Sequence, residues 1–195
     1  EAEKSFKRAL EFSPNYATAH QWYGEYLLAV GKTNDSFAAL QKAQELDPLS
    51  LIIATDIAGY FYTTRQFDKA VEQSLKVSEM DKNFLYAYIF LWISHEQNGN
   101  IGEAAKAMFQ TEKLFLPNEI VQQGQAVFQK DGWKGLWELK YAQTTQPPLN
   151  QYFTNYQRAI AALRIEDIEK TFEWLQKSAE VRERWFVNLK FDPQW

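Results

Sequence analysis

The sequence predicts an all-α fold built from repeated helical hairpins, and two observations support this prediction. The first two-thirds of the 195-residue chain align with themselves at one constant shift, which carries Ala2 onto Ser36 and Ser36 onto Ala70. Each repeat contains two segments whose apolar residues recur at helical spacing, separated by residues that favour turns. A period of about 34 residues is typical of helical pairs that stack on one another. We therefore expect each hairpin to bury its apolar face against the next.

Small residues and turn residues mark the repeat period most clearly. Four series recur at this period: Ala2, Ser36, Ala70 and Ala104; Ala9, Ala43, Val77 and Thr111; Leu46, Met80 and Leu114; and Gly31, Arg65 and Gly99. Small side chains let the two helices of a hairpin approach closely, and we expect Gly24 and Ala58 to serve this purpose on the first helix. Trp92 stands in the same series, so we expect the last of these hairpins to splay or shift.

The repeated part of the chain is expected to form seven helices, at residues 1–13, 16–30, 35–46, 51–64, 67–80, 84–98 and 101–115. Gly31 supplies a turn after one helix, and Pro48 stops the next because proline cannot continue the hydrogen-bond ladder. The array at residues 1–116 thus divides into a half repeat at 1–14 and full repeats at about 15–48, 49–82 and 83–116. Because the first helix lacks a partner before it, we expect a fragment of a longer chain.

The period blurs after Pro117. Residues 118–130 and 133–144 read as two helices separated by a break at Asp131-Gly132, which makes residues 117–148 a degenerate hairpin. Residues 149–163 and 166–182 predict one more hairpin, and the remaining residues to 195 predict a cap. A cap is expected because the last repeat of a stack has an apolar face without a neighbour.

Part of this pattern is typical of a known family. The residues Tyr23-Gly24, Leu27, Gly31, Ser36, Leu40, Ala43 and Asp47-Pro48 resemble the tetratricopeptide repeat, as do Ile57-Ala58, Phe61, Phe67 and Ala70. The resemblance covers residues 1–116 and implies a right-handed superhelix whose first helices line a concave groove that binds protein. The ending, residues 185–193, resembles the tail of tetratricopeptide regions in bacterial multidomain regulators and sensor proteins. That resemblance implies a larger regulatory or signalling protein.

Composition excludes several classes of function. The chain has no cysteine, so it has no disulfide, thiolate metal site or cysteine nucleophile. Its net charge is −4 and its lysines and arginines are scattered, which argues against a nucleic-acid surface. No apolar run approaches the ~20 residues of a membrane span. The compartment stays open between the cytoplasm, which we favour, and the periplasm.

Catalytic chemistry is also missing from the sequence. The two histidines, His20 and His95, each fall in an inward-facing series, and a lone histidine without a positioned partner does little. We find no His/Asp/Glu cluster at ligand spacing and no phosphate loop. We therefore expect neither an enzyme nor a cofactor.

The predicted groove is formed by the inner face of the first helix in each repeat. Stepping by the repeat period gives four rows: Thr18, Ile52 and Tyr86; Gln21, Thr55 and Ile89; Glu25, Gly59 and Ile93; and Leu28, Tyr62 and Glu96. The rows are polar at their N-terminal end and apolar toward the last repeat. This distribution favours a protein or peptide partner, an extended or helical segment with apolar anchors. The alternative is a structural module that self-associates as a homo-oligomer, with its own C-terminal tail in the groove.

Overall fold

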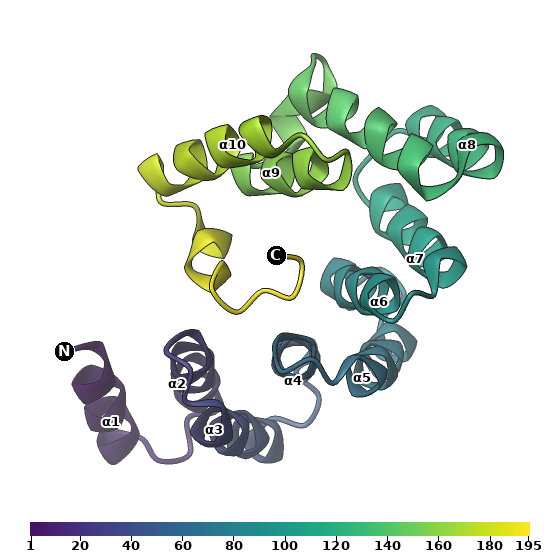
Figure 1. The fold of residues 1–195 in the computed structure, drawn as a ribbon. Helices are drawn as coiled ribbons and strands as arrows, with labels where there is room; N and C mark the ends of the chain where they lie inside the picture. The colour runs from purple at the N-terminus through teal and green to yellow at the C-terminus, as the bar shows by residue number, and fades with distance from the viewer. The chain divides into compact units, whose positions relative to one another are not determined.

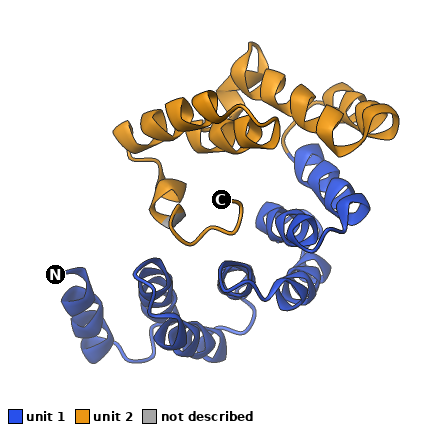
Figure 2. Cartoon of the chain, viewed as in Figure 1, with its two compact units in different colours: residues 1–114 blue, residues 115–195 orange. Residues whose placement is uncertain are grey.

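The computed structural model describes residues 1–195, apart from the side chain of Asn188. The described residues form α-helices and short 3-10 helices, without strands, in two compact units, Glu1–Leu114 and Phe115–Trp195 (Figures 1 and 2). The helices of the first unit are α1 (Ala2–Phe12), α2 (Ala17–Ala29), α3 (Thr33–Leu46), α4 (Leu51–Thr63), α5 (Phe67–Met80), α6 (Leu85–Gln97) and α7 (Ile101–Lys113). These bounds agree with the predicted helices to within two residues.

Consecutive helices of the first unit pair as hairpins. α2 packs on α3, α4 on α5 and α6 on α7, and each hairpin packs on the next through α3 with α4 and α5 with α6. Figure 1 shows α2, α4 and α6 along one side of this unit and α3, α5 and α7 along the other. The unit is therefore a helical solenoid with an inner and an outer row of helices.

The turn inside each hairpin has the same geometry. The three residues of the predicted turn series have positive φ angles: 80° at Gly31, 60° at Arg65 and 73° at Gly99. In each turn the next amide donates back to a carbonyl five residues earlier at 2.8 Å, the bond that closes a Schellman motif. Glycine adopts positive φ at little steric cost, whereas Arg65 must adopt it with a side chain. The turn series is confirmed at all three places.

Close approach of the helices explains the small residues. Ser36, Ala70 and Ala104 are fully buried. A Cβ added to Gly24 would lie 2.8 Å from Leu40 Cγ and 3.2 Å from the carbonyl oxygen of Ser36. The Ser36 hydroxyl also donates to the Gly24 carbonyl oxygen at 2.8 Å. The α2–α3 hairpin is thus packed at a distance that only glycine permits.

Aromatic residues fill the spaces between hairpins. Leu40, Ile57 and Tyr60 form one buried cluster, and Tyr62, Ala70 and Ile93 form another. Trp92, which stands in the small-residue series, packs against the second cluster, and α6 and α7 pair as a hairpin.

The second unit contains α8 (Asn118–Thr145), α9 (Asn155–Arg164), α10 (Ile168–Glu180) and two 3-10 helices, Leu149–Tyr152 and Arg184–Asn188. Gly132 interrupts α8 with φ 70° and ψ −159°, which confirms the predicted break. The prediction of one helix over residues 149–163 is wrong. The chain is extended at Phe153 and Thr154, and a capping box between Thr154 and Gln157 starts α9 afresh.

The C-terminal segment folds back onto α9. The Glu183 carboxylate accepts hydrogen bonds of 2.8 Å from the amides of Asn155 and Tyr156, the first two of α9, where the helix dipole favours an anion. The buried Tyr156 hydroxyl donates to Asp192 Oδ2 at 2.7 Å and accepts from Trp195 Nε1 at 2.8 Å. Burial, aided by the Asp192 carboxylate, raises the pKa of Tyr156 above its usual range. These contacts fix the tail on α9.

Candidate functional site

The twelve residues of the predicted groove all lie on α2, α4 and α6, the inner row of the first unit. α2 packs on α4 and α4 on α6, so neighbouring members of each row lie on adjacent helices. Their exposure differs along the rows. Ile52 and Tyr86, both from the first row, are 56% and 43% exposed. They form an apolar edge near the N-terminal ends of α4 and α6.

The middle of the predicted groove is engaged in contacts within the unit. Gln21 Nε2 donates to Asp56 Oδ2 at 2.6 Å and thereby links α2 to α4. The buried Thr55 hydroxyl donates to the Leu51 carbonyl oxygen at 2.7 Å. A Cβ on Gly59 would lie 2.9 Å from Cζ of Phe90, so the absence of a side chain there makes room for that ring. The polar middle therefore serves the packing of the inner helices.

The remaining members of the rows are buried or half-buried. Tyr62 and Ile93 belong to the buried cluster around Ala70, and Ile89 packs against it. Four others are half-buried: Thr18, Glu25, Leu28 and Glu96. The structure thus places all twelve on the inner helices but leaves only Ile52 and Tyr86 as large exposed apolar side chains.

Comparison with known proteins finds matches only among solved structures. Neither the family models nor the curated proteins give a match. The crystal structure of YrrB, described as a TPR protein with an unusual peptide-binding site, superposes with a TM-score of 0.55 and 18% identity over 96% of this chain and 97% of YrrB. PilF of Pseudomonas aeruginosa superposes with a TM-score of 0.59 and 14% identity over 97% of this chain and 87% of PilF.

The fold is a tetratricopeptide-repeat (TPR) fold. The predicted all-helical solenoid and the resemblance to the TPR family are confirmed at this level. Identities of 14% and 18% show the fold alone, so the peptide-binding site named for YrrB is a property of YrrB and is not carried over to this chain. The candidate site on this chain has to be argued from its own residues.

The two histidines of the TPR chain occupy structural positions. His20 is half-buried, and its Nε2 lies 2.8 Å from the Pro14 carbonyl oxygen. Burial lowers the pKa of His95, and the nearby Glu103 carboxylate partly opposes the shift. In the part of the chain that the structure describes, no group of three His, Asp or Glu side chains could hold a metal ion. No described helix is long and apolar enough to cross a membrane.

A hollow on the outer side of the first unit was not predicted from the sequence. It has a volume of about 290 Å³, and its lining includes Phe37, Gln41, Phe61, Lys69, Glu72 and Lys76, from α3, α4 and α5. We call this hollow the outer notch. A signal was present in the sequence, because Phe37 and Gln41, and likewise Lys69, Glu72 and Lys76, recur at the three-to-four-residue spacing of one helix face.

Proposed function

We propose that this chain is a non-catalytic interaction scaffold that binds a peptide or helical segment of a partner protein along α2, α4 and α6. The observation that supports the proposal is the apolar edge formed by Ile52 and Tyr86. These side chains occupy the same place in successive repeats, and both are large, apolar and substantially exposed. The wider setting, a larger bacterial regulatory or signalling protein, rests on the resemblance of residues 185–193.

The spacing of the two anchors limits what the partner can present. Helices that pack directly, as α4 and α6 do, have axes ~8–10 Å apart. On a partner helix, residues seven apart are separated by ~10.5 Å along the axis. On an extended strand, side chains on one face recur every two residues, ~7 or ~13 Å apart, and neither spacing matches. A helix with apolar residues at i and i+7 would match both anchors.

The expected contribution of the anchors follows from their exposure. Fully burying an isoleucine side chain stabilises by ~1.5–3 kcal/mol. About half of each anchor is already buried, so partner binding gains about 1 kcal/mol from each. Loss of about 1 kcal/mol weakens binding about fivefold. Truncation of both anchors should therefore weaken binding by roughly 25-fold.

The experiment begins with selection of peptides from a random display library against the full chain. The dissociation constant of one selected peptide is then measured for the wild type and for Ile52→Ala, Tyr86→Ala and Ile89→Asp. Leu75→Ala is the matched control, because Leu75 is a similarly exposed apolar residue on the outer helix α5. Wild-type affinity in all three inner-row variants, with helicity retained, would contradict the groove assignment. Failure to select any binding peptide would contradict the scaffold function.

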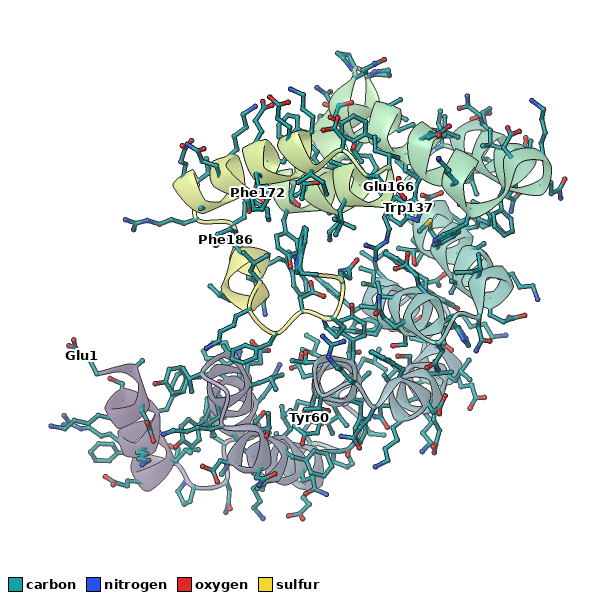
Figure 3. The ribbon with its side chains drawn as sticks, viewed as in Figure 1. Glu1, Tyr60, Trp137, Glu166, Phe172 and Phe186 are labelled. Atoms are coloured by element: carbon teal, nitrogen blue, oxygen red, sulfur yellow. The ribbon has the colours of Figure 1, made fainter. Side chains whose placement is uncertain are left out.

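A second candidate function is self-association, and one observation favours it. Ile168 and Phe172 lie four residues apart on α10 and are 54% and 67% exposed (Phe172 is labelled in Figure 3). An apolar stripe of this kind could pair with the same stripe of a second copy in a twofold dimer. Sedimentation of the wild type beside Phe172→Asp tests it. A monomer at every concentration would exclude self-association.

The same candidate includes a groove filled by the chain's own tail. Because the chain has no native cysteine, single cysteines introduced at Ile52 and Val187 can carry spin labels at unique positions. A short, narrow distance distribution between the labels would support self-filling, and a broad, long one would exclude it.

A further inference from the structure

The outer notch lies on the opposite side of α4 from the predicted groove. Its floor includes Ile57 and Phe61 of α4. These residues follow Thr55 and Gly59 by two positions, which is about 200° around the helix. The notch therefore shares α4 with the predicted groove but no lining residue.

The floor of the notch is aromatic and packs against the buried core. The Phe37 ring stacks on Tyr60 with centroids 4.8 Å apart and tilts against Phe61 at 5.6 Å (Tyr60 is labelled in Figure 3). Both phenylalanines pack against the buried cluster that contains Ile57 and Tyr60. These ring contacts are already present without a ligand, so binding of an apolar group does not require the phenylalanine side chains to rearrange.

The rim of the notch is polar and carries a local positive charge. Lys69 Nζ lies 5.5 Å from the centre of the Phe61 ring. Lys76 Nζ forms a 2.7 Å ion pair with Glu72, and its hydrogen bond lowers the pKa of the Glu72 carboxyl. Two ammonium groups thus face one carboxylate, in a chain whose net charge is −4. Each ammonium has three donors, which leaves hydrogen-bonding capacity for a further anion.

This chemistry is specific to one place in the array. One repeat period further along the chain, Phe37, Phe61, Lys69 and Lys76 are replaced by Val71, His95, Glu103 and Gln110. The equivalent position between α5 and α7 therefore has no phenylalanine floor and carries a carboxylate where the notch has a lysine. The notch is therefore not a feature that every repeat of the array carries.

We infer that the outer notch binds an acidic segment of a partner protein, with one aromatic side chain in the notch and carboxylates beside it facing Lys69 and Lys76. A volume of about 290 Å³ accommodates a single aromatic side chain. Small-molecule sites bury most of their ligand, ~70–90% of its surface. Here Lys69, Glu72 and Lys76 on the rim are exposed, so a ligand stays partly uncovered. A protein segment can instead continue across α3 and α5. This second site is independent of the predicted groove.

The probe is an acetylated and amidated five-residue peptide with a phenylalanine between two pairs of aspartates. Isothermal titration calorimetry on the full chain at low salt should show saturable binding that weakens as salt is raised. Lys69→Gln combined with Lys76→Gln should weaken binding at least fivefold. Gln41→Trp, which places an indole at the rim with the charges intact, should abolish it. Circular dichroism confirms that each variant is folded.

Matched controls separate this site from its alternatives. Lys42→Gln removes an exposed lysine of α3 that pairs with Glu45, outside the notch lining, and should bind as the wild type does. Tyr86→Ala, in the predicted groove, should also leave binding unchanged. The proposal is overturned by wild-type affinity in the double lysine variant or by equal binding of a peptide with alanine in place of phenylalanine. It is also overturned by no binding at millimolar peptide, or by equally tight binding of free phenylpropionate, which would assign the notch to a small molecule.

Discussion

The close contact at Gly24 makes the α2–α3 hairpin sensitive to a single methyl group. In Gly24→Ala the new Cβ would lie 2.8 Å from Leu40 Cγ, 3.0 Å from Leu40 Cδ2 and 3.2 Å from the Ser36 carbonyl oxygen. Leu40 is almost fully buried, so its side chain has little room to move, and the carbonyl oxygen belongs to α3 itself. Overpacking of this kind costs ~1–3 kcal/mol. Against this cost, alanine has a helix propensity ~1 kcal/mol more favourable than that of glycine.

The net expectation for Gly24→Ala is a loss of up to about 2 kcal/mol in the free energy of unfolding. Gly102→Ala is the matched control on α7. A Cβ there meets no atom within 4 Å, and the residue lies in the first turn of the helix. This control should be neutral or should stabilise by up to about 1 kcal/mol. The comparison isolates the packing distance, because both substitutions add the same methyl group to a helix.

Urea unfolding of both variants, followed by circular dichroism in the far ultraviolet, measures the difference. A change in midpoint without a change in slope reports stability alone. The expected order is Gly24→Ala below the wild type and Gly102→Ala at or above it. If Gly24→Ala were as stable as Gly102→Ala, the hairpin would be looser than the structure describes, and the packing explanation for the small-residue series would be refuted.

Three further predictions concern backbone strain, the tail and pH. Arg65→Gly removes a left-handed conformation that costs ~1–2 kcal/mol with a side chain, and it adds ~0.5–1 kcal/mol of glycine entropy cost. It should therefore raise the thermal unfolding midpoint, whereas Gly99→Ala should lower it. The opposite order would contradict the turn assignment. Glu183→Gln should lower the stability of the second unit by about 2 kcal/mol, because it weakens the charged hydrogen bonds at the start of α9. Hydrogen exchange of the α9 amides should become faster. Unchanged exchange would exclude this role for Glu183. The pKa of Glu3 is lowered to about 2, first by a hydrogen bond from Lys32. The stabilisation from this contact is therefore fully present above pH 4.5 and is lost as the pH falls through 2. NMR titration of the Glu3 carboxyl should show a midpoint near 2, and Lys32→Gln should raise that midpoint.

The repeat made the helices predictable, because the signals that end them are local. Gly31 and Gly99 adopt positive φ, and the repeat period identified Arg65 as their equivalent although arginine is not a turn former. Gly132 breaks α8 for the same local reason. The error at residues 149–163 also had a local signal. Thr154 and Gln157 stand at capping-box spacing, which marks the start of a helix that the apolar periodicity of residues 149–163 does not show.

The candidate site was predictable in position but not in accessibility. Stepping by the repeat period places a residue on an inner helix, whereas its exposure depends on neighbours that vary between repeats. Gln21 is buried and hydrogen-bonded to Asp56, and Gly59 accommodates the Phe90 ring. Neither pairing follows from periodicity, because each joins one repeat to different residues of the next. The outer notch had a signal on each separate helix face, but the signal does not show that α3, α4 and α5 combine to form one hollow.

α4 connects the two proposed sites, and this arrangement predicts that they act independently. Eight of its residues are buried, including Ile57, which lines the notch, and Tyr62, which belongs to the cluster around Ala70. A helix with most of its residues buried has little freedom to adopt a second arrangement through which one ligand could alter the other site. We therefore expect Lys69→Gln and Tyr86→Ala to be additive in the full chain, each weakening only its own peptide. Titration of the acidic peptide with the inner-row peptide already bound should give an unchanged dissociation constant. A shift beyond about threefold would mean that α4 moves between two states.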